Sequence, residues 1–152
     1  MSTNGTPYFL PRSMAQGRAN YPHARTVPAI GSTVYVSGTS SRRGDGTYEG
    51  VTENADGTFT CDIGTQTAAV LRNIGTTIEG ATNSKASLDN IVDATVFLTD
   101  MAGCYKGMNQ EWNKVWPDRA TAPARTTIEV SALPDPRLLV EIKCTVFVRD
   151  EA

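Results

Sequence analysis

Two charged residues near the C-terminus stand where a site for acid–base chemistry could form. Arg125 and Glu141 lie at the starts of two stretches in which apolar and polar residues alternate, as they do in strands. The alternating rows are Thr126, Ile128 and Val130, then Val140, Ile142, Cys144, Val146 and Val148. Pro134-Asp135-Pro136 lies between them and predicts a turn.

The chemistry of this pair follows from the two side chains. A guanidinium is a planar fork that suits a carboxylate, and a nearby carboxylate can take a proton from water. Arg125 and Glu141 could therefore form a site that hydrolyses a small carboxylate. The alternative is a cross-strand ion pair on a solvated sheet face, because Glu141 is opposite in parity to the apolar row.

The spacing of the pair also bears on assembly. If the two strands form a simple hairpin around residues 134–137, Arg125 lies opposite about residue 146, and Glu141 lies ~16 Å further along the strand. The two side chains would then not meet within one hairpin. We therefore expect the site to combine groups from two subunits.

Composition limits the classes of protein and partner. The chain has 152 residues, of which 39% are hydrophobic and 20% charged, which fits one globular domain. A net charge of -2 argues against nucleic acid as a partner, since Arg42-Arg43 is the only adjacent basic pair. There is no long apolar run or signal-like segment, so we expect no membrane partner and a cytoplasmic location.

The cysteines and the histidine give no metal-site pattern. Cys61, Cys104 and Cys144 are far apart and form no C-x-x-C, so neither zinc nor a disulfide framework is indicated, and Cys144 falls on the core side of its strand. His23 is the single histidine. It invites a catalytic role, but without a neighbouring nucleophile or carboxylate motif a structural role is the more common one.

The remaining elements follow from periodicity. We expect a flexible arm over residues 1–19, a single domain over 20–152, a strand over 33–37 and an irregular hairpin or surface excursion over 44–62. The pattern then predicts a helix over 65–78 with Gly80 at its end, a strand over 91–99, and a helix over 104–116 ended by Pro117. The Trp and Met stripe of the second helix indicates core rather than a cofactor site.

This order predicts an α+β fold, with a mixed β-sheet and two helices packed on one face. The other face would stay exposed. Its apolar residues, expected to be Leu139, Phe147 and Phe97, suggest that it packs against another subunit. No phosphate-binding glycine motif follows any strand, which removes the usual nucleotide-binding classes.

From about Tyr21 to Val148 the chain resembles the Rid proteins, the YjgF/YER057c/UK114 family. The motifs that carry the resemblance are Val36-Ser37-Gly38, Gln66 and Asn73, Val92 to Met101, Met108-Asn109, Pro123 to Thr127, and Val140-Glu141-Ile142. The resemblance implies a chorismate-mutase-like fold and a homotrimer with sites between subunits. It also implies hydrolysis of enamines or imines to ketones and ammonia, without a metal or other cofactor.

The resemblance also implies roles for single residues. Arg125 would clamp the substrate carboxylate and Glu141 would handle the attacking water. Tyr21 and Asn109 would line the cleft, and we group Thr127 with them as a substrate-binding residue. The absence of an H-x-E and P-C-x-x-C signature agrees with chemistry that does not use zinc.

Three segments, residues 20–25, 37–43 and 138–143, look most like the 2-aminomuconate deaminase subfamily. Such a substrate has a carboxylate at each end, and we expect Arg42 or Arg43, with Ser40 or Ser41, to receive the distal one. The alternative for this loop is a solvated surface. The alternative functions are a general deaminase of 2-aminoacrylate and similar imines, and a non-catalytic ligand-binding or translation-inhibitor protein.

Overall fold

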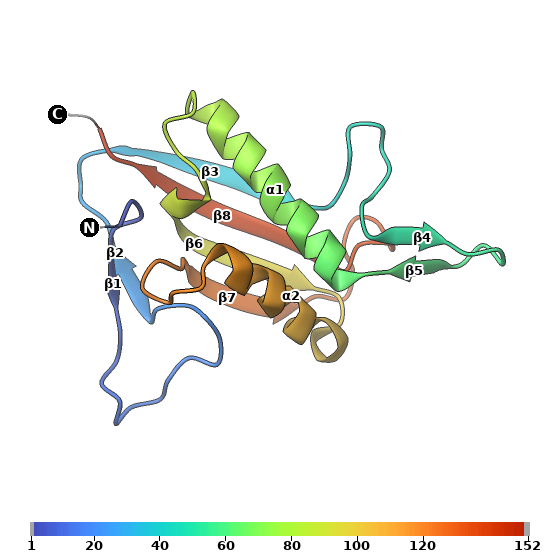
Figure 1. Cartoon of the computed structure of the whole chain (residues 1–152), viewed down its shortest axis with the longest axis horizontal. Coiled ribbons are helices and arrows are strands. Elements are labelled where there is room, and N and C mark those ends of the chain that lie inside the picture. The colour runs from blue at the N-terminus through green and yellow to red at the C-terminus, as the bar shows by residue number, and fades with distance from the viewer. Residues whose placement is uncertain (1, 151–152) are drawn as a thin grey trace.

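The computed structural model describes residues 2–150 and contains one four-stranded sheet (Figure 1). Its strand order is β3-β8-β6-β7. These strands are β3 Ser32–Thr39, β8 Val140–Val148, β6 Ile91–Leu98 and β7 Ala124–Glu129. β8 is antiparallel to both of its neighbours, whereas β7 is parallel to β6. Helices α1, Ile63–Ala81, and α2, Met101–Val115, lie on one face of the sheet, as predicted.

Helix α1 is longer than its apolar pattern predicts. Asp62 caps its start by accepting a hydrogen bond from the backbone N–H of Thr65. Gly80, expected to end the helix, lies inside it. The end comes at Thr82, whose backbone N–H and hydroxyl both donate to the carbonyl of Ile78. The chain then reverses through two residues with positive φ, so no glycine is needed.

Helix α2 begins one turn earlier than expected, because Asp100 caps it by accepting from the N–H of Gly103. Its buried residues are Cys104, Met108 and Trp112. The ring centroids of Trp112 and Trp116 lie 4.3 Å apart. The predicted Trp and Met stripe is therefore packed in the core, between the helices and the sheet.

The prediction that the last two strands form a hairpin is wrong. β6 lies between β7 and β8, and it pairs in parallel with β7 and antiparallel with β8. Parallel neighbours need a long crossover, and α2 provides it between β6 and β7. The estimate that places Arg125 opposite residue 146 is wrong for the same reason.

The two faces of the sheet differ as the alternation predicts. Val140, Ile142, Cys144 and Val146 of β8 are buried under the helices. On the uncovered face, Tyr35 is 77% exposed and Ile128 39% exposed.

Of the three apolar residues expected on the uncovered face, Phe97 and Phe147 lie there by strand parity and Leu139 does not. Leu139 packs against the core instead. Phe147 is buried beside Gly31, where an added Cβ would overlap its ring. Phe97 lies on the uncovered face and is half-buried.

Two small strand pairs lie at opposite ends of the sheet (Figure 1). β4, Val51–Glu53, and β5, Phe59–Cys61, form the hairpin predicted within residues 44–62. β1, Thr6–Tyr8, pairs with β2, Ala24–Thr26, so part of the predicted arm is bonded to the domain. The flexibility of the arm stays a prediction. A short 3-10 helix, Leu88–Asn90, precedes β6. No helix within residues 2–150 is long and apolar enough to cross a membrane.

Candidate functional site

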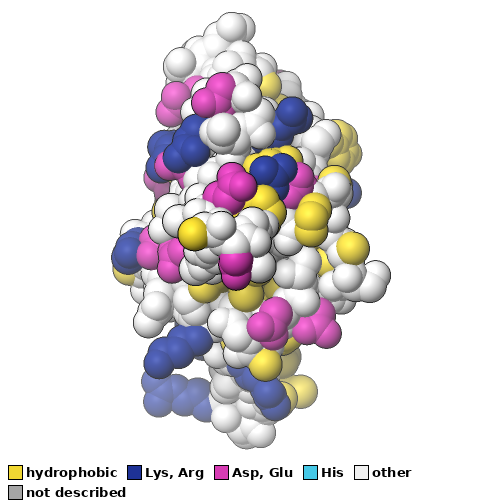
Figure 2. All heavy atoms as spheres, turned by 90° about the vertical axis from the view of Figure 1, so that its right-hand side faces the viewer, with side chains coloured by type: hydrophobic (Ala, Val, Ile, Leu, Met, Phe, Trp, Pro, Cys, Tyr) yellow, Lys and Arg dark blue, Asp and Glu magenta, His cyan; other side chains and the backbone are white. Residues whose placement is uncertain are grey.

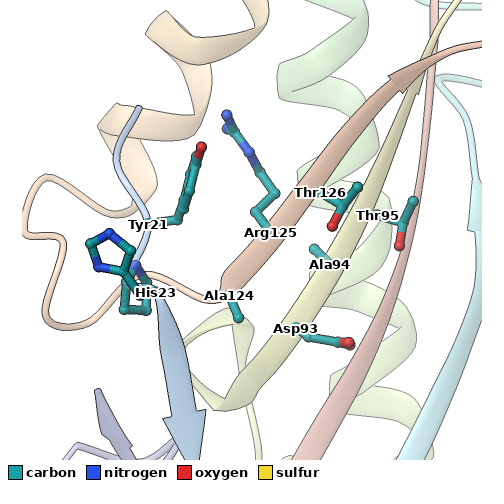
Figure 3. Close-up of a pocket in the computed structure, with 9 residues that line it drawn as sticks. Tyr21, His23, Asp93, Ala94, Thr95, Ala124, Arg125 and Thr126 are labelled. Atoms are coloured by element: carbon teal, nitrogen blue, oxygen red, sulfur yellow. The ribbon is translucent and has the colours of Figure 1, made fainter. Parts of the chain in front are cut away.

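Arg125 is the centre of the candidate site. It lies at the start of β7 beside Ala94, whose side chain is buried under the helices, so the guanidinium also points to the helix side. Its central carbon lies 4.7 Å from the ring centroid of Trp112 and 5.2 Å from that of Tyr21. Figure 3 shows the Arg125 side chain pointing toward Tyr21. Cation–π attraction to two aromatic rings helps to hold this guanidinium in place.

One edge of this guanidinium has no partner within the protein. Arg125 Nη1 lies 3.7 Å from the sulfur of Met108, whereas Nε and Nη2 are buried and make no hydrogen bond. Five other buried side-chain atoms of the described residues share this condition. Two of them lie on the elements that carry or contact Arg125: Asn109 Oδ1 on α2, and Thr127 Oγ1 two residues along β7 from Arg125. An unpaired buried polar group costs about 1–3 kcal/mol. A cluster of them therefore points to a polar ligand.

The Nε and Nη2 edge is the one that binds a carboxylate with two parallel hydrogen bonds. Burial lowers the pKa of the Arg125 guanidinium, whereas the charges of Tyr105 and Tyr21 and a weak side-chain hydrogen bond with Tyr105 oppose this shift. Arginine stays charged under these conditions. The site therefore offers a fixed cation with a free fork. We call Arg125, Tyr21, Trp112, Asn109 and Thr127 the Arg125 cluster.

A cavity of about 290 Å³ opens beside this cluster (Figure 3). It is lined by Tyr21, Pro22, His23, Asp93, Ala94, Thr95, Ala124, Arg125 and Thr126. His23 holds the N-terminal segment here. Its Nδ1 accepts from the N–H of Leu10 at 3.1 Å, and its Nε2 lies 3.2 Å from the carbonyl of Ala15. Both ring nitrogens thus contact backbone groups, which agrees with a structural role.

Glu141 lies on the other face of the sheet. Its partner on β6 is Phe97, three residues beyond the partner of Arg125, and its carboxylate packs against Gly38 of β3. A Cβ at Gly38 would overlap Glu141 Oε1, so a larger residue there would displace the Glu141 carboxylate. One chain therefore does not bring Arg125 and Glu141 together, and the alternative of a cross-strand ion pair between them is wrong.

Arg42 and Arg43 lie in the loop after β3, at the end of the sheet that carries β4 and β5 (Figure 1). Arg43 donates to the Thr47 hydroxyl and lies 3.9 Å from Glu49, whereas Arg42 forms an isolated bridge with Tyr48. Figure 2 views this end and shows basic and acidic side chains interspersed. This loop lies toward Glu141, not toward the Arg125 cluster.

Sequence reasoning missed three residues at the site. Trp112 and Met108 were assigned to the core alone, yet both contact Arg125. Arg119 donates to the backbone of Tyr21 and was not considered. The helical spacing of Met108 and Trp112, next to Asn109, is the signal that could have placed these two at the cleft.

A family model described as Endoribonuclease L-PSP matches residues 14–148 of the chain. RutC family protein slr0709 of Synechocystis sp. is 37% identical over 87 residues, which are 57% of this chain and 62% of that protein. Reactive Intermediate Deaminase A, chloroplastic, of Arabidopsis thaliana is 37% identical over 79 residues, 52% of this chain and 38% of that protein. The matches thus span less than two thirds of either relative.

Solved structures extend the comparison. The crystal structure of Rv2704 from Mycobacterium tuberculosis, a member of the YjgF/YER057c/UK114 family, is 28% identical to the chain. Its TM-score is 0.59, and the match covers 78% of this chain and 81% of that one. This similarity confirms the predicted chorismate-mutase-like α+β fold.

Proposed function

Because the chain belongs to the Endoribonuclease L-PSP family, the YjgF/YER057c/UK114 or Rid proteins, we propose that it is a deaminase of enamine and imine carboxylates. The products would be a 2-oxo acid and ammonia. The observation that carries this proposal is the unpaired Nε and Nη2 edge of the buried Arg125. The name of the Arabidopsis relative, a reactive intermediate deaminase, supports the same class of reaction.

Arg125 would bind the substrate carboxylate with its free edge, and Asn109 and Thr127 would add hydrogen bonds beside it. Tyr21 would cover one face of the guanidinium. An enamine that has tautomerised to an iminium is already electrophilic. The protein then needs only to orient the substrate, place a water and move protons.

Glu141 would supply the proton transfers. It accepts a proton from water as the oxygen adds to the iminium carbon, which gives a carbinolamine. The proton then passes to the nitrogen, the carbon–nitrogen bond breaks, and ammonia leaves. The carbinolamine hydroxyl gives its proton to the released ammonia as the ketone forms, so iminium plus water becomes ketone plus ammonium.

This mechanism requires two copies of the chain at one site, since Arg125 and Glu141 lie on opposite faces of one sheet. We propose the homotrimer that the family resemblance implies, with the Arg125 cluster of one subunit facing Glu141 of the next. The partly apolar uncovered face, with Tyr35 and Ile128 exposed, supports such an association. Cytoplasmic location stays a prediction.

For the substrate, we propose 2-aminomuconate, which would give 2-oxohex-3-enedioate. Its second carboxylate needs a donor away from Arg125. Arg42 would be this donor, because its side chain is exposed in the loop that follows β3, the strand whose Gly38 packs against Glu141. Arg43 lies 3.9 Å from Glu49 and is therefore less available. The alternative is a general imine deaminase that acts on 2-aminoacrylate, which the name of the Arabidopsis relative favours.

Two other classes compete with this proposal. A ligand-binding protein without turnover would use Arg125 but has no evident need for Glu141. Cleavage of RNA, named in the family description, would need a basic surface, and the net charge of -2 does not favour one. We therefore propose small carboxylates, not nucleic acid, as ligands.

An ammonia-release assay tests the proposal. Purified protein is given 2-aminomuconate or, in parallel, imines generated in situ by an amino-acid oxidase. We expect release above the uncatalysed rate with both, and faster release with 2-aminomuconate. Faster release with monocarboxylate imines would favour the general deaminase. No acceleration with either substrate would refute the enzyme.

A further inference from the structure

Arg119 joins two distant parts of the chain beside the Arg125 cluster. It lies in the loop between α2 and β7, and its Nε and Nη2 donate to the carbonyl oxygen of Tyr21 at 3.3 and 3.2 Å. Its guanidinium carbon lies 5.3 Å from the ring centroid of Phe9. Arg119 therefore ties the N-terminal segment to the loop that leads into the strand of Arg125.

The neighbours of Tyr21 are held by the same helix that contacts Arg125. The carbonyl of Asn20 accepts a hydrogen bond from the indole N–H of Trp112 at 3.0 Å, and the Asn20 side chain donates to the carbonyl of Trp116. The ring of Tyr21 lies close to Gly17, where an added Cβ would be 3.1 Å from Tyr21 Cε2. The backbone and the ring of Tyr21 are both fixed.

We propose that Arg119 is a positioning residue that holds Tyr21 against the guanidinium of Arg125. The inference rests on the proposed function, because it assigns Tyr21 the task of orienting and shielding the carboxylate clamp. Arg119 does not line the 290 Å³ cavity, so it would act through Tyr21 and not on the substrate. Without the ring of Tyr21, the Arg125 guanidinium would be more mobile and more hydrated. Each of these changes weakens its binding of a carboxylate.

Substitution of Arg119 should affect substrate binding more than turnover. A carboxylate clamp holds the substrate in the ground state and in the transition state alike, so its loosening raises KM more than it lowers kcat. Arg119→Ala should raise KM, and the Kd of a 2-oxo carboxylate product, about tenfold, as for loss of one charged hydrogen bond. Arg119→Lys should fall between, because an ammonium donates to Tyr21 without the planar fork.

Three further variants separate positioning from general damage. Arg12→Ala removes an exposed arginine from the same segment and should leave KM and Kd unchanged. Gly17→Ala keeps Arg119 but presses on the Tyr21 ring by a few tenths of an ångström, and should raise KM less than Arg119→Ala does. In a Tyr21→Ala background, Arg119→Ala should add little, because both changes remove the same contact.

The proposal is overturned if Arg119→Ala and Tyr21→Ala have additive effects, or if kcat falls while KM holds. A measurement without ligand keeps it separate from the enzyme proposal. The NMR shifts of the Tyr21 ring protons should move in Arg119→Ala and stay in Arg12→Ala. If they move while no carboxylate binds the wild-type protein, the positioning stands and the deaminase proposal fails. Unmoved ring shifts would refute the positioning.

Discussion

The role of Arg125 is set by which of its atoms already have partners. The rings of Tyr21 and Trp112 pack against the guanidinium and Met108 contacts Nη1, whereas Nε and Nη2 make no hydrogen bond. A surface arginine would reach a similar carboxylate only by giving up its freedom of rotation. The packing around Arg125 has removed that freedom in advance, so more of the interaction energy is available for binding.

Arg125→Lys tests this geometry while it keeps the charge. An ammonium cannot form the two parallel bonds, so we expect kcat/KM to fall about ten- to a hundredfold, the equivalent of 1.5–3 kcal/mol. Far-UV circular dichroism and the unfolding temperature check that the fold is retained. Wild-type kcat/KM in a folded Arg125→Lys protein would show that the fork is not used.

Glu141→Gln tests the proton transfers. The amide keeps the size of the side chain beside Gly38 but cannot act as a base. We expect the Kd of a 2-oxo carboxylate, measured by calorimetry, to stay within about twofold, while kcat falls by roughly 10² or more. Turnover at the wild-type rate would remove Glu141 from the mechanism.

Local sequence predicts most elements but not how two of them pair. The helices follow from apolar spacing, and the caps at Asp62 and Asp100 explain why both begin earlier than the apolar rows. The neighbours of β7 and β8 could not be read from their alternation, because β6 enters between them from 30 or more residues away in sequence. Pairing of this kind depends on α2 covering the crossover, which is a tertiary effect.

The site was predictable to a similar degree. Motif resemblance named Arg125, Tyr21, Asn109 and Thr127. The structure packs Tyr21 against Arg125, and it leaves the side-chain oxygens of Asn109 and Thr127 buried and unpaired on α2 and β7. It does not gather Glu141, Arg42 or Arg43 with them. Which face a strand residue occupies depends on register with neighbours, and the sequence of β7, with threonines on both parities, does not specify it.

The loop after β3 separates the substrate hypotheses. If Arg42 receives a distal carboxylate, Arg42→Ala should reduce kcat/KM about ten- to a hundredfold for a dicarboxylate and hardly at all for a monocarboxylate imine. Arg43→Ala is the matched control, because Arg43 is engaged by Thr47 and Glu49. Equal effects of Arg42→Ala on both substrates would favour the general imine deaminase.

At the scale of the whole molecule, one chain is half of each proposed site. Its sheet has one face without helices, and Arg125 and Glu141 lie on opposite faces of that sheet. Association would therefore create the reaction centre as well as bury the exposed face. Activity per chain should then fall when the protein is diluted below the dissociation constant of the assembly.

Mixing two impaired variants tests this arrangement. Arg125→Lys and Glu141→Gln subunits, co-expressed in equal amounts, should recover roughly a quarter of wild-type activity, because a quarter of random interfaces pair two unaltered groups. As the control, the two variants are purified separately and mixed after assembly, under conditions in which subunits do not exchange; this mixture should recover no activity. If both groups act within one chain, no mixture recovers activity.

The position of the tryptophans has a practical consequence. The chain has two, Trp112 and Trp116, with rings 4.3 Å apart, and Trp112 also lies against the Arg125 guanidinium. Indoles at this separation couple their electronic transitions, and a nearby cation changes their emission. A bound anion that neutralises Arg125 should therefore change both the exciton signal of the Trp112–Trp116 pair and the tryptophan fluorescence. Because the chain has no other tryptophan, neither signal has a background. The protein carries its own optical reporter of an occupied clamp.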